Sequence, residues 1–241
     1  IFFGSGGSSA IIALVPNGSV FKYFPLLASP SDSKASIKHV EDIIKYEIEV
    51  AKTLTKEMVE KNLTPHIIRY LTTHKCDKEP REIFKDCPSY ATYLGSKKSS
   101  RKCNLMYSFM SPRTLRKPMY VLEMEKADST LENAIKEIAK KRWDKIESFL
   151  DLLFFQIFYT LETIKKIYPL YSHNDLFIRN ILSLKKQGKP ATYFRYHFKN
   201  KSYDLPADGL FVKLSDFSMN DFSSKLSKKH NLPERIGDPY R

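Results

Sequence analysis

Residues 171–184 read YSHNDLFIRNILSL and place His173, Asp175 and Asn180 among mostly apolar side chains. A buried carboxylate or carboxamide costs free energy unless hydrogen bonds or a bound ligand satisfy it. The segment is therefore predicted to be a functional loop, in which these polar groups serve a chemical task.

Apolar periodicity predicts the elements on both sides of this loop. Residues 143–168 precede it and are apolar nearly all round, so we expect a central helix there. A shorter helix is expected over 128–141, where DST provides an N-cap signal. Short strands are expected after the loop at 192–198, 201–206 and 210–217.

The first half of the chain alternates short strands and turns at 1–9, 10–15 and 19–24. A helix beginning near Ser36 follows, and further strands are expected at 64–74 and 118–124. The apolar residues of the helix that begins near Ser36 recur every three or four positions, at Val40, Ile44, Ile48, Ala51, Leu54 and Met58. This order predicts an α+β fold with a small antiparallel sheet, one long helix and then a mainly helical part.

The composition is that of an ordinary globular protein, with 42% hydrophobic and 13% aromatic residues in 241. No apolar run reaches the length of a membrane span, and the first residues do not resemble a signal peptide. The chain has no initiating Met, so we expect it to be a piece of a longer one. A net charge of +13 allows a nucleic-acid partner, but short basic runs in predicted loops favour ordinary solvated charge.

Three cysteines, Cys76, Cys87 and Cys103, lie in one polar region. An odd number favours reduced thiols in an intracellular protein. A zinc site that adds His74 is the less favoured alternative, because the spacings lack the tight pairs typical of zinc ligands.

Four motifs occur in one order along the chain. They are G-x-G-x-x-G with Ser9 as the third residue, a strand lysine at Lys22, H-x-D-x-x-x-x-N at residues 173–180, and D-F-G with Ser218 as its last residue. In type and order they resemble the motifs of the eukaryotic protein-kinase family.

The resemblance implies a bilobal fold. The N-lobe would comprise residues 1–123, with a long insertion at about 75–117, and a partial C-lobe would comprise 124–241. The chain would then stop inside the activation segment, before the family's later helices.

The resemblance also implies the chemistry. Asp175 would accept the proton of a substrate hydroxyl, while Asn180 and Asp216 would bind Mg²⁺, with Mn²⁺ as an alternative ion. Lys22 would neutralise the inner phosphates of ATP, and His173 would pack against Phe217. Further nucleotide contacts are expected from Gly4, Ser5, Gly6, Gly7, Ser8, Ser9, Ile11, Val20, Leu122, Glu123, Glu125, Asp128 and Leu182. Asp128 has an alternative role as a helix cap.

The resemblance also implies that a helix glutamate holds Lys22 in place, and Glu47 and Glu49 are the two candidates. At 100° per residue, Glu47 falls within the apolar stripe of Ile44, Ile48 and Ala51, whereas Glu49 points nearly opposite. We therefore predict that Glu47 is the partner.

Some positions depart from the family pattern. Asn174 replaces the usual arginine before the catalytic aspartate, which predicts that activity does not depend on phosphorylation of the activation segment. Phe177 and Arg179 leave the substrate hydroxyl open between Ser/Thr and Tyr, with Ser/Thr preferred on frequency alone. The tyrosine-rich insertion at 193–209 resembles kinases of large DNA viruses.

The sequence therefore predicts an ATP-dependent protein kinase acting on a protein substrate in the cytoplasm, or in the host cytoplasm or nucleus if it is viral. Two alternatives stay open. The HNDLxxxNIL pattern also resembles aminoglycoside and choline kinases, which phosphorylate small molecules. A pseudokinase scaffold is disfavoured because Lys22, Asp175, Asn180 and Asp216 are all present.

Overall fold

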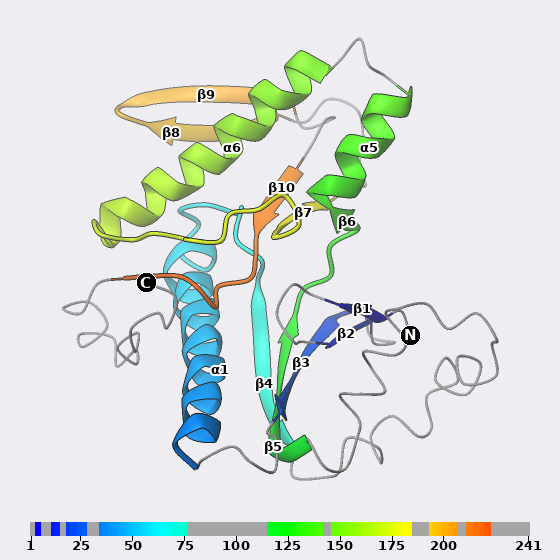
Figure 1. Ribbon diagram of the computed structural model, residues 1–241. Helices are drawn as coiled ribbons and strands as arrows, with labels where there is room; N and C mark the ends of the chain where they lie inside the picture. Colours follow the sequence, from blue (N-terminus) through cyan, green and yellow to red (C-terminus); the bar gives the residue numbers. More distant parts are fainter. Residues whose placement is uncertain are drawn as a thin grey trace. The chain divides into compact units, whose positions relative to one another are not determined.

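The computed structural model describes residues 3–5, 11–14, 18–27, 34–76, 115–141, 146–184, 193–206 and 211–222 (Figure 1). The chain divides into two compact units, which are considered separately. Unit 1 comprises residues 1–48 and 70–126, and unit 2 comprises residues 49–69 and 127–241. Helices and antiparallel sheets occur together, so the α+β class is confirmed, and these elements are compatible with a kinase-like fold.

Unit 1 is built on a five-stranded antiparallel sheet of order β1-β2-β3-β5-β4. Gly18 has φ +86°, a conformation that glycine adopts without strain, and it precedes β3. Within β3 and β5, the side chains of Tyr23, Phe24, Val121 and Leu122 are buried. The strands are β1 (Phe3–Ser5), β2 (Ile11–Leu14), β3 (Val20–Leu27), β4 (Tyr70–Cys76) and β5 (Leu115–Met124).

Helix α1 (Lys34–Leu54) contains the predicted apolar stripe. Ile44, Ile48, Ala51 and Leu54 are buried, while Val40 near its start is exposed. The helix runs into a single π-helical turn, η1 (Thr55–Val59), in which the Glu60 amide donates to the Thr55 carbonyl at 3.0 Å. This wider turn extends the buried stripe to Met58.

In the described ranges, unit 2 contains two complete α-helices and two groups of strands. Strands β10, β7 and β6 form one antiparallel sheet in that order, and β8 and β9 form a separate hairpin. The elements are β6 (Ser129–Thr130), α5 (Leu131–Lys141), α6 (Ile146–Ile167), β7 (Ile181–Leu184), β8 (Tyr193–Phe198), β9 (Lys201–Pro206) and β10 (Phe211–Leu214).

Strand β10 is at the edge of its sheet, and side chains satisfy its outer backbone groups. The Val212 amide donates to Oε1 of Gln156 at 2.9 Å, and the Val212 carbonyl accepts from Nδ1 of His66 at 2.7 Å. Backbone hydrogen bonds join His66 and Ile68 to Leu214. Buried backbone groups need such partners, so this arrangement fixes the strand that leads to Asp216.

Residues 64–74 were expected to form one strand, but β4 begins only at Tyr70. Ile67 instead forms an isolated parallel bridge with Leu214 in unit 2. The apolar pattern of this segment reflects burial against β10 rather than membership of the first sheet.

Helix α6 was expected to be buried nearly all round, and this expectation is wrong. One face is buried, but Phe154 and Phe158 on the opposite side are 50% and 61% exposed. Their rings stack on one another with centroids 6.1 Å apart. A helix this rich in apolar residues gives little periodic signal, so its exposed face could not be identified from sequence. The buried residues are Phe149, Leu153, Gln156, Ile157, Thr160, Thr163 and Ile164.

The β8–β9 hairpin packs against α6 through aromatic rings, and Figure 1 shows the two elements side by side. Tyr196 is buried and contacts Phe155 and Tyr159 edge to face, with centroids 5.1 and 5.0 Å away. Its hydroxyl bonds to Nε2 of His66 at 2.9 Å. The tyrosine-rich insertion is therefore a packed part of unit 2.

None of the helices in the described ranges has both the length and the apolar character that a membrane-spanning segment needs.

Candidate active site

Lys22 and Glu47 form a buried ion pair in unit 1. Lys22 lies in β3 and Glu47 in α1, and their side chains are only 6% and 4% exposed. The Lys22 ammonium donates to Oε1 of Glu47. Glu49, two residues along the helix, pairs only loosely with Lys52 at 3.9 Å and is 43% exposed. The helical phase therefore identified the correct partner.

Neighbouring strands surround Lys22 with apolar residues. Lys22 is in register with Ile12 of β2 and Leu122 of β5, and Leu122 is 1% exposed. The Lys22 ammonium also lies 5.1 Å from the centroid of the Phe24 ring. An ammonium in such surroundings interacts strongly with an anion, because little water screens it.

The Glu123 side chain, near the end of β5, has partners on both of its oxygens. Glu123 accepts a hydrogen bond from Ser19 Oγ at 2.6 Å, and its other oxygen lies 3.3 Å from Nε2 of His74. Its side chain is thus engaged locally, and its backbone lies between Phe21 of β3 and Thr72 of β4, so the predicted nucleotide contact stays a prediction. Val20 is half-buried in β3, and Glu125 follows β5.

The predicted glycine-rich loop lies mostly outside the described residues. Gly4 and Ser5 belong to β1, where they pair with Ile12 and Ile11 of β2. Residues 6–9 are outside the described ranges.

In unit 2 the loop after α6 joins Asp175 to Asn180. Nδ2 of Asn180 donates to the Asp175 carbonyl at 2.9 Å and to Oδ2 of Asp175 at 2.8 Å. The side chain of Asp175 is 20% exposed, and Arg179 Nη2 lies 3.6 Å from its Oδ1. The half-exposed Arg179 contributes little to this pair. One carboxylate in a fixed orientation therefore remains accessible to solvent.

Asn180 is also fixed from the opposite side. Its carbonyl accepts from the Ser215 amide at 2.9 Å and from Ser215 Oγ at 2.7 Å. Strand β7, which begins directly after it, pairs Leu182 with Lys213 of β10. These bonds tie the Asp175 loop to the residue immediately before Asp216. Ser215 was not identified from sequence, and no motif marks it.

The donor set fits the expected magnesium ligands. Both Nδ2 hydrogen bonds of Asn180 point to Asp175, and its Oδ1 accepts none of the hydrogen bonds among described residues. Asp216 has φ +61° and accepts from Ser218 Oγ at 3.2 Å. A carboxylate and a carboxamide oxygen are hard ligands suited to Mg²⁺. Within the described ranges, no three His, Cys, Asp or Glu side chains group closely enough to form a metal site by themselves.

His173 is buried and packs against Phe217, as expected, with ring centroids 5.8 Å apart. Burial lowers the pKa of its imidazole, and the nearby Asp216 carboxylate offsets only part of this effect. The ring contact with Phe217 is the expected one, and the structural role of His173 stays a prediction.

Asn174 connects the loop to the segment after Asp216. Its Nδ2 donates to the Met219 carbonyl at 3.1 Å, and its Oδ1 accepts from Ser172 Oγ at 2.5 Å. Asn174 has φ +58°, a conformation that asparagine tolerates better than most residues. A neutral side chain with hydrogen bonds to two segments therefore occupies the position at which protein kinases usually have arginine.

Asp128 was expected either to contact the nucleotide or to cap the following helix. The cap of α5 is Thr130, whose hydroxyl accepts from the Asn133 amide at 3.4 Å, and Asp128 is exposed. Cys76 is half-buried at the end of β4, and Cys87 and Cys103 lie outside the described ranges, so the reduced state of the three cysteines stays a prediction.

Comparison with known proteins agrees with these motifs. No model of a known protein family matches the chain. Two proteins of Acanthamoeba polyphaga mimivirus are each 27% identical to it, over 92% and 86% of its length. They are named "Putative serine/threonine-protein kinase R301" and "Putative serine/threonine-protein kinase R400". The chain spans 60% and 43% of their respective lengths. This similarity supports the assignment of the chain to a viral-type protein-kinase family.

Proposed function

We propose that this chain provides the catalytic residues of an ATP-dependent protein kinase, which transfers the outer phosphate of Mg-ATP to a serine or threonine hydroxyl. The mimivirus relatives are named for this activity. The observation that supports the proposal most is the Lys22–Glu47 pair, since a buried ion pair is a costly way to stabilise a fold. Such a pair is expected where an ammonium must be held ready for a phosphate.

Each residue would have a distinct task. Glu47 holds the Lys22 ammonium, which neutralises phosphate charge. Asp175 accepts the proton of the acceptor hydroxyl, and the amide of Asn180 keeps that carboxylate in one orientation. When bound, magnesium would neutralise phosphate charge, and Asp216 together with Oδ1 of Asn180 would hold it.

The decisive experiment incubates the natural full-length protein with labelled ATP, magnesium and a protein mixture, beside the Asp175→Asn variant. We expect labelled protein that disappears almost completely in the variant. Asp151→Asn is the matched control, because Asp151 is an exposed aspartate of α6 with no place in the proposed chemistry.

Two other outcomes would overturn the proposal. Label that enters added choline or aminoglycosides but no protein would indicate a small-molecule kinase. ATP binding without any Asp175-dependent transfer would indicate a pseudokinase.

A further inference from the structure

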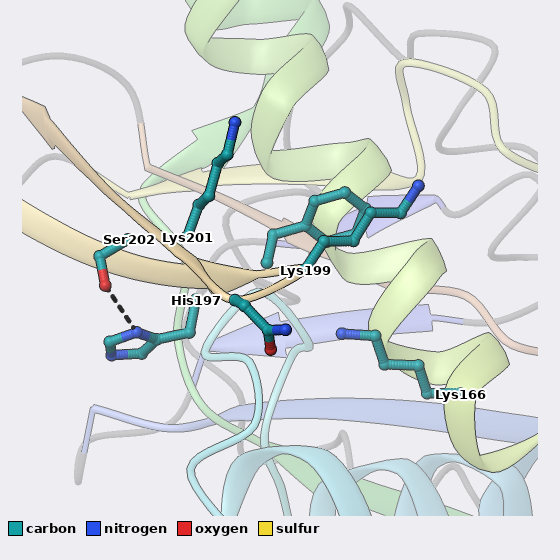
Figure 2. A pocket seen from close by; sticks show the side chains of 7 residues that line it. Lys166, His197, Lys199, Lys201 and Ser202 are labelled. Atoms are coloured by element: carbon teal, nitrogen blue, oxygen red, sulfur yellow. Dashed lines mark hydrogen bonds between the residues drawn. The ribbon is translucent and has the colours of Figure 1, made fainter.

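A second site, independent of the proposed phosphotransfer residues, lies at the tip of the β8–β9 hairpin. A cavity of about 440 Å³ is lined there by residues 197–202 and by Lys166 near the end of α6. Figure 2 shows the lysine side chains of both elements around this cavity. Its volume is in the range of pockets that accept small ligands or single side chains.

No carboxylate among the described residues pairs with the lysines of this pocket. None of the ammonium groups of Lys166, Lys199 and Lys201 forms an ion pair with a carboxylate in the described part of the chain. Asp204 is the one acid of the hairpin, and Arg195 binds it with two hydrogen bonds of 2.8 Å. Three cations at one pocket repel each other, and an anion would relieve that repulsion.

An aromatic ring organises two of these cations. The ammonium groups of Lys166 and Lys199 lie 5.3 and 5.4 Å from the centroid of the Phe198 ring. Cation–π contacts of this kind restrict the side chains without neutralising their charge. Ser202 Oγ and Nδ1 of His197 are hydrogen-bonded at 3.0 Å, and both residues also line the pocket (Figure 2).

The hairpin turn holds Lys199 in a backbone conformation that is unfavourable for lysine. Lys199 and Asn200 both have positive φ, +47° and +63°, as a two-residue hairpin turn requires. Asparagine tolerates this conformation, but a lysine there is less favourable than glycine. The lysine is therefore not explained by the turn geometry.

We propose that this pocket binds a phosphorylated side chain of a protein segment. A phosphate carries nearly two negative charges and three acceptor oxygens at neutral pH. It matches three ammonium groups and neighbouring polar groups better than a carboxylate, which has one charge and two oxygens.

A nucleic-acid strand fits the pocket less well. Single strands are held by aromatic rings on which bases stack and by a basic groove that follows the backbone. Here the Phe198 ring is already engaged by two ammonium groups, and the cations gather at one hairpin tip instead of along a groove.

Fluorescence anisotropy tests the proposal with the labelled peptide Gly-Ser-Gly-pSer-Gly-Ser-Gly and its unphosphorylated form. The full chain should bind the phosphorylated peptide, and binding should weaken as salt is raised. The triple variant Lys166→Gln, Lys199→Gln, Lys201→Gln should bind it at least about tenfold more weakly. All three lysines are exposed, so folding should be retained and is checked by circular dichroism.

The matched control replaces three exposed lysines elsewhere, Lys38→Gln, Lys56→Gln and Lys140→Gln, with the same loss of charge. It should bind like the natural chain. Equal weakening in both variants, or equal binding of the unphosphorylated peptide, would overturn the proposal. So would tighter binding of oligothymidylate that the first triple variant abolishes.

Discussion

Glu47 and Glu49 are two residues apart on α1 and differ in almost every physical respect. Glu47 is buried and paired with Lys22, whereas Glu49 is 43% exposed and only loosely paired. Removing one partner of a buried pair leaves an uncompensated charge, which costs about 3–5 kcal/mol. Exposed pairs of the second kind contribute about 0–1 kcal/mol.

Glu47→Gln should therefore lower the free energy of unfolding by about 3 kcal/mol and strongly reduce phosphotransfer. Glu49→Gln should change both little. Urea denaturation and labelled-ATP turnover measure the two effects. Similar losses in both variants would show that the Lys22 pair has no special role.

His66 is a second residue with an informative environment. The Val212 carbonyl can only accept, so Nδ1 carries the proton and Nε2 accepts from the Tyr196 hydroxyl. Burial, first, and the nearby Lys213 charge lower the pKa of His66 to about 4. The folded protein therefore keeps this ring neutral across the range in which a free histidine becomes charged.

This difference predicts a pH dependence with a definite sign. Below the ordinary histidine pKa of about 6.5, the unfolded chain binds a proton that the folded chain does not. The free energy of unfolding therefore decreases as the pH is lowered. Between pH 6.5 and 5 the loss attributable to His66 should be about 1.6 kcal/mol. Urea midpoints across this range measure it.

His66→Phe should be less stable overall, but it should lose about 1.6 kcal/mol less than the natural chain over the same pH range. His74→Gln is the control for removal of an exposed histidine. An unaltered pH dependence in His66→Phe would contradict the assignment.

Among the elements, the loop between α6 and β7 is held by neutral hydrogen bonds. Asn174 donates to the Met219 carbonyl, and the Ser172 and Asp221 backbones exchange two hydrogen bonds at 2.9 and 2.8 Å. Neither contact requires a phosphate. An arginine at position 174 would instead offer a bidentate partner for one.

We therefore expect phosphatase treatment of the full-length protein to change its kinase activity less than about twofold. Asn174→Arg should make activity sensitive to such treatment if the activation segment is phosphorylated. Mass spectrometry before and after treatment confirms the phosphorylation state. A tenfold or larger loss in the natural protein would contradict this prediction.

For the whole molecule, Mg-ATP should stabilise the chain. A ligand that binds only the folded state stabilises it by about 2.7 kcal/mol at one hundred times its dissociation constant. The melting temperature should rise with ATP and magnesium, and less with ATP and a chelator, because Asp216 and Asn180 would need the ion to engage the phosphates.

Lys22→Met should abolish most of this shift, while Lys136→Met, which removes an exposed ammonium paired with Glu132, should preserve it. Differential scanning fluorimetry measures the shift in melting temperature for the natural chain with magnesium, the natural chain with a chelator, and each of the two variants. A shift of equal size with and without magnesium would argue against the proposed ligands.

The sequence alone determined the α+β class and most elements, because apolar residues recur with the periods of strands and helices. The helical phase also identified Glu47, while the resemblance to protein kinases implied the packing of His173 on Phe217. Only the tertiary structure decided which face of α6 is exposed and which groups cover the edge of β10. Gln156, His66 and Tyr196 are far apart along the chain, and nothing in their local sequence specifies the backbone or ring that each one contacts.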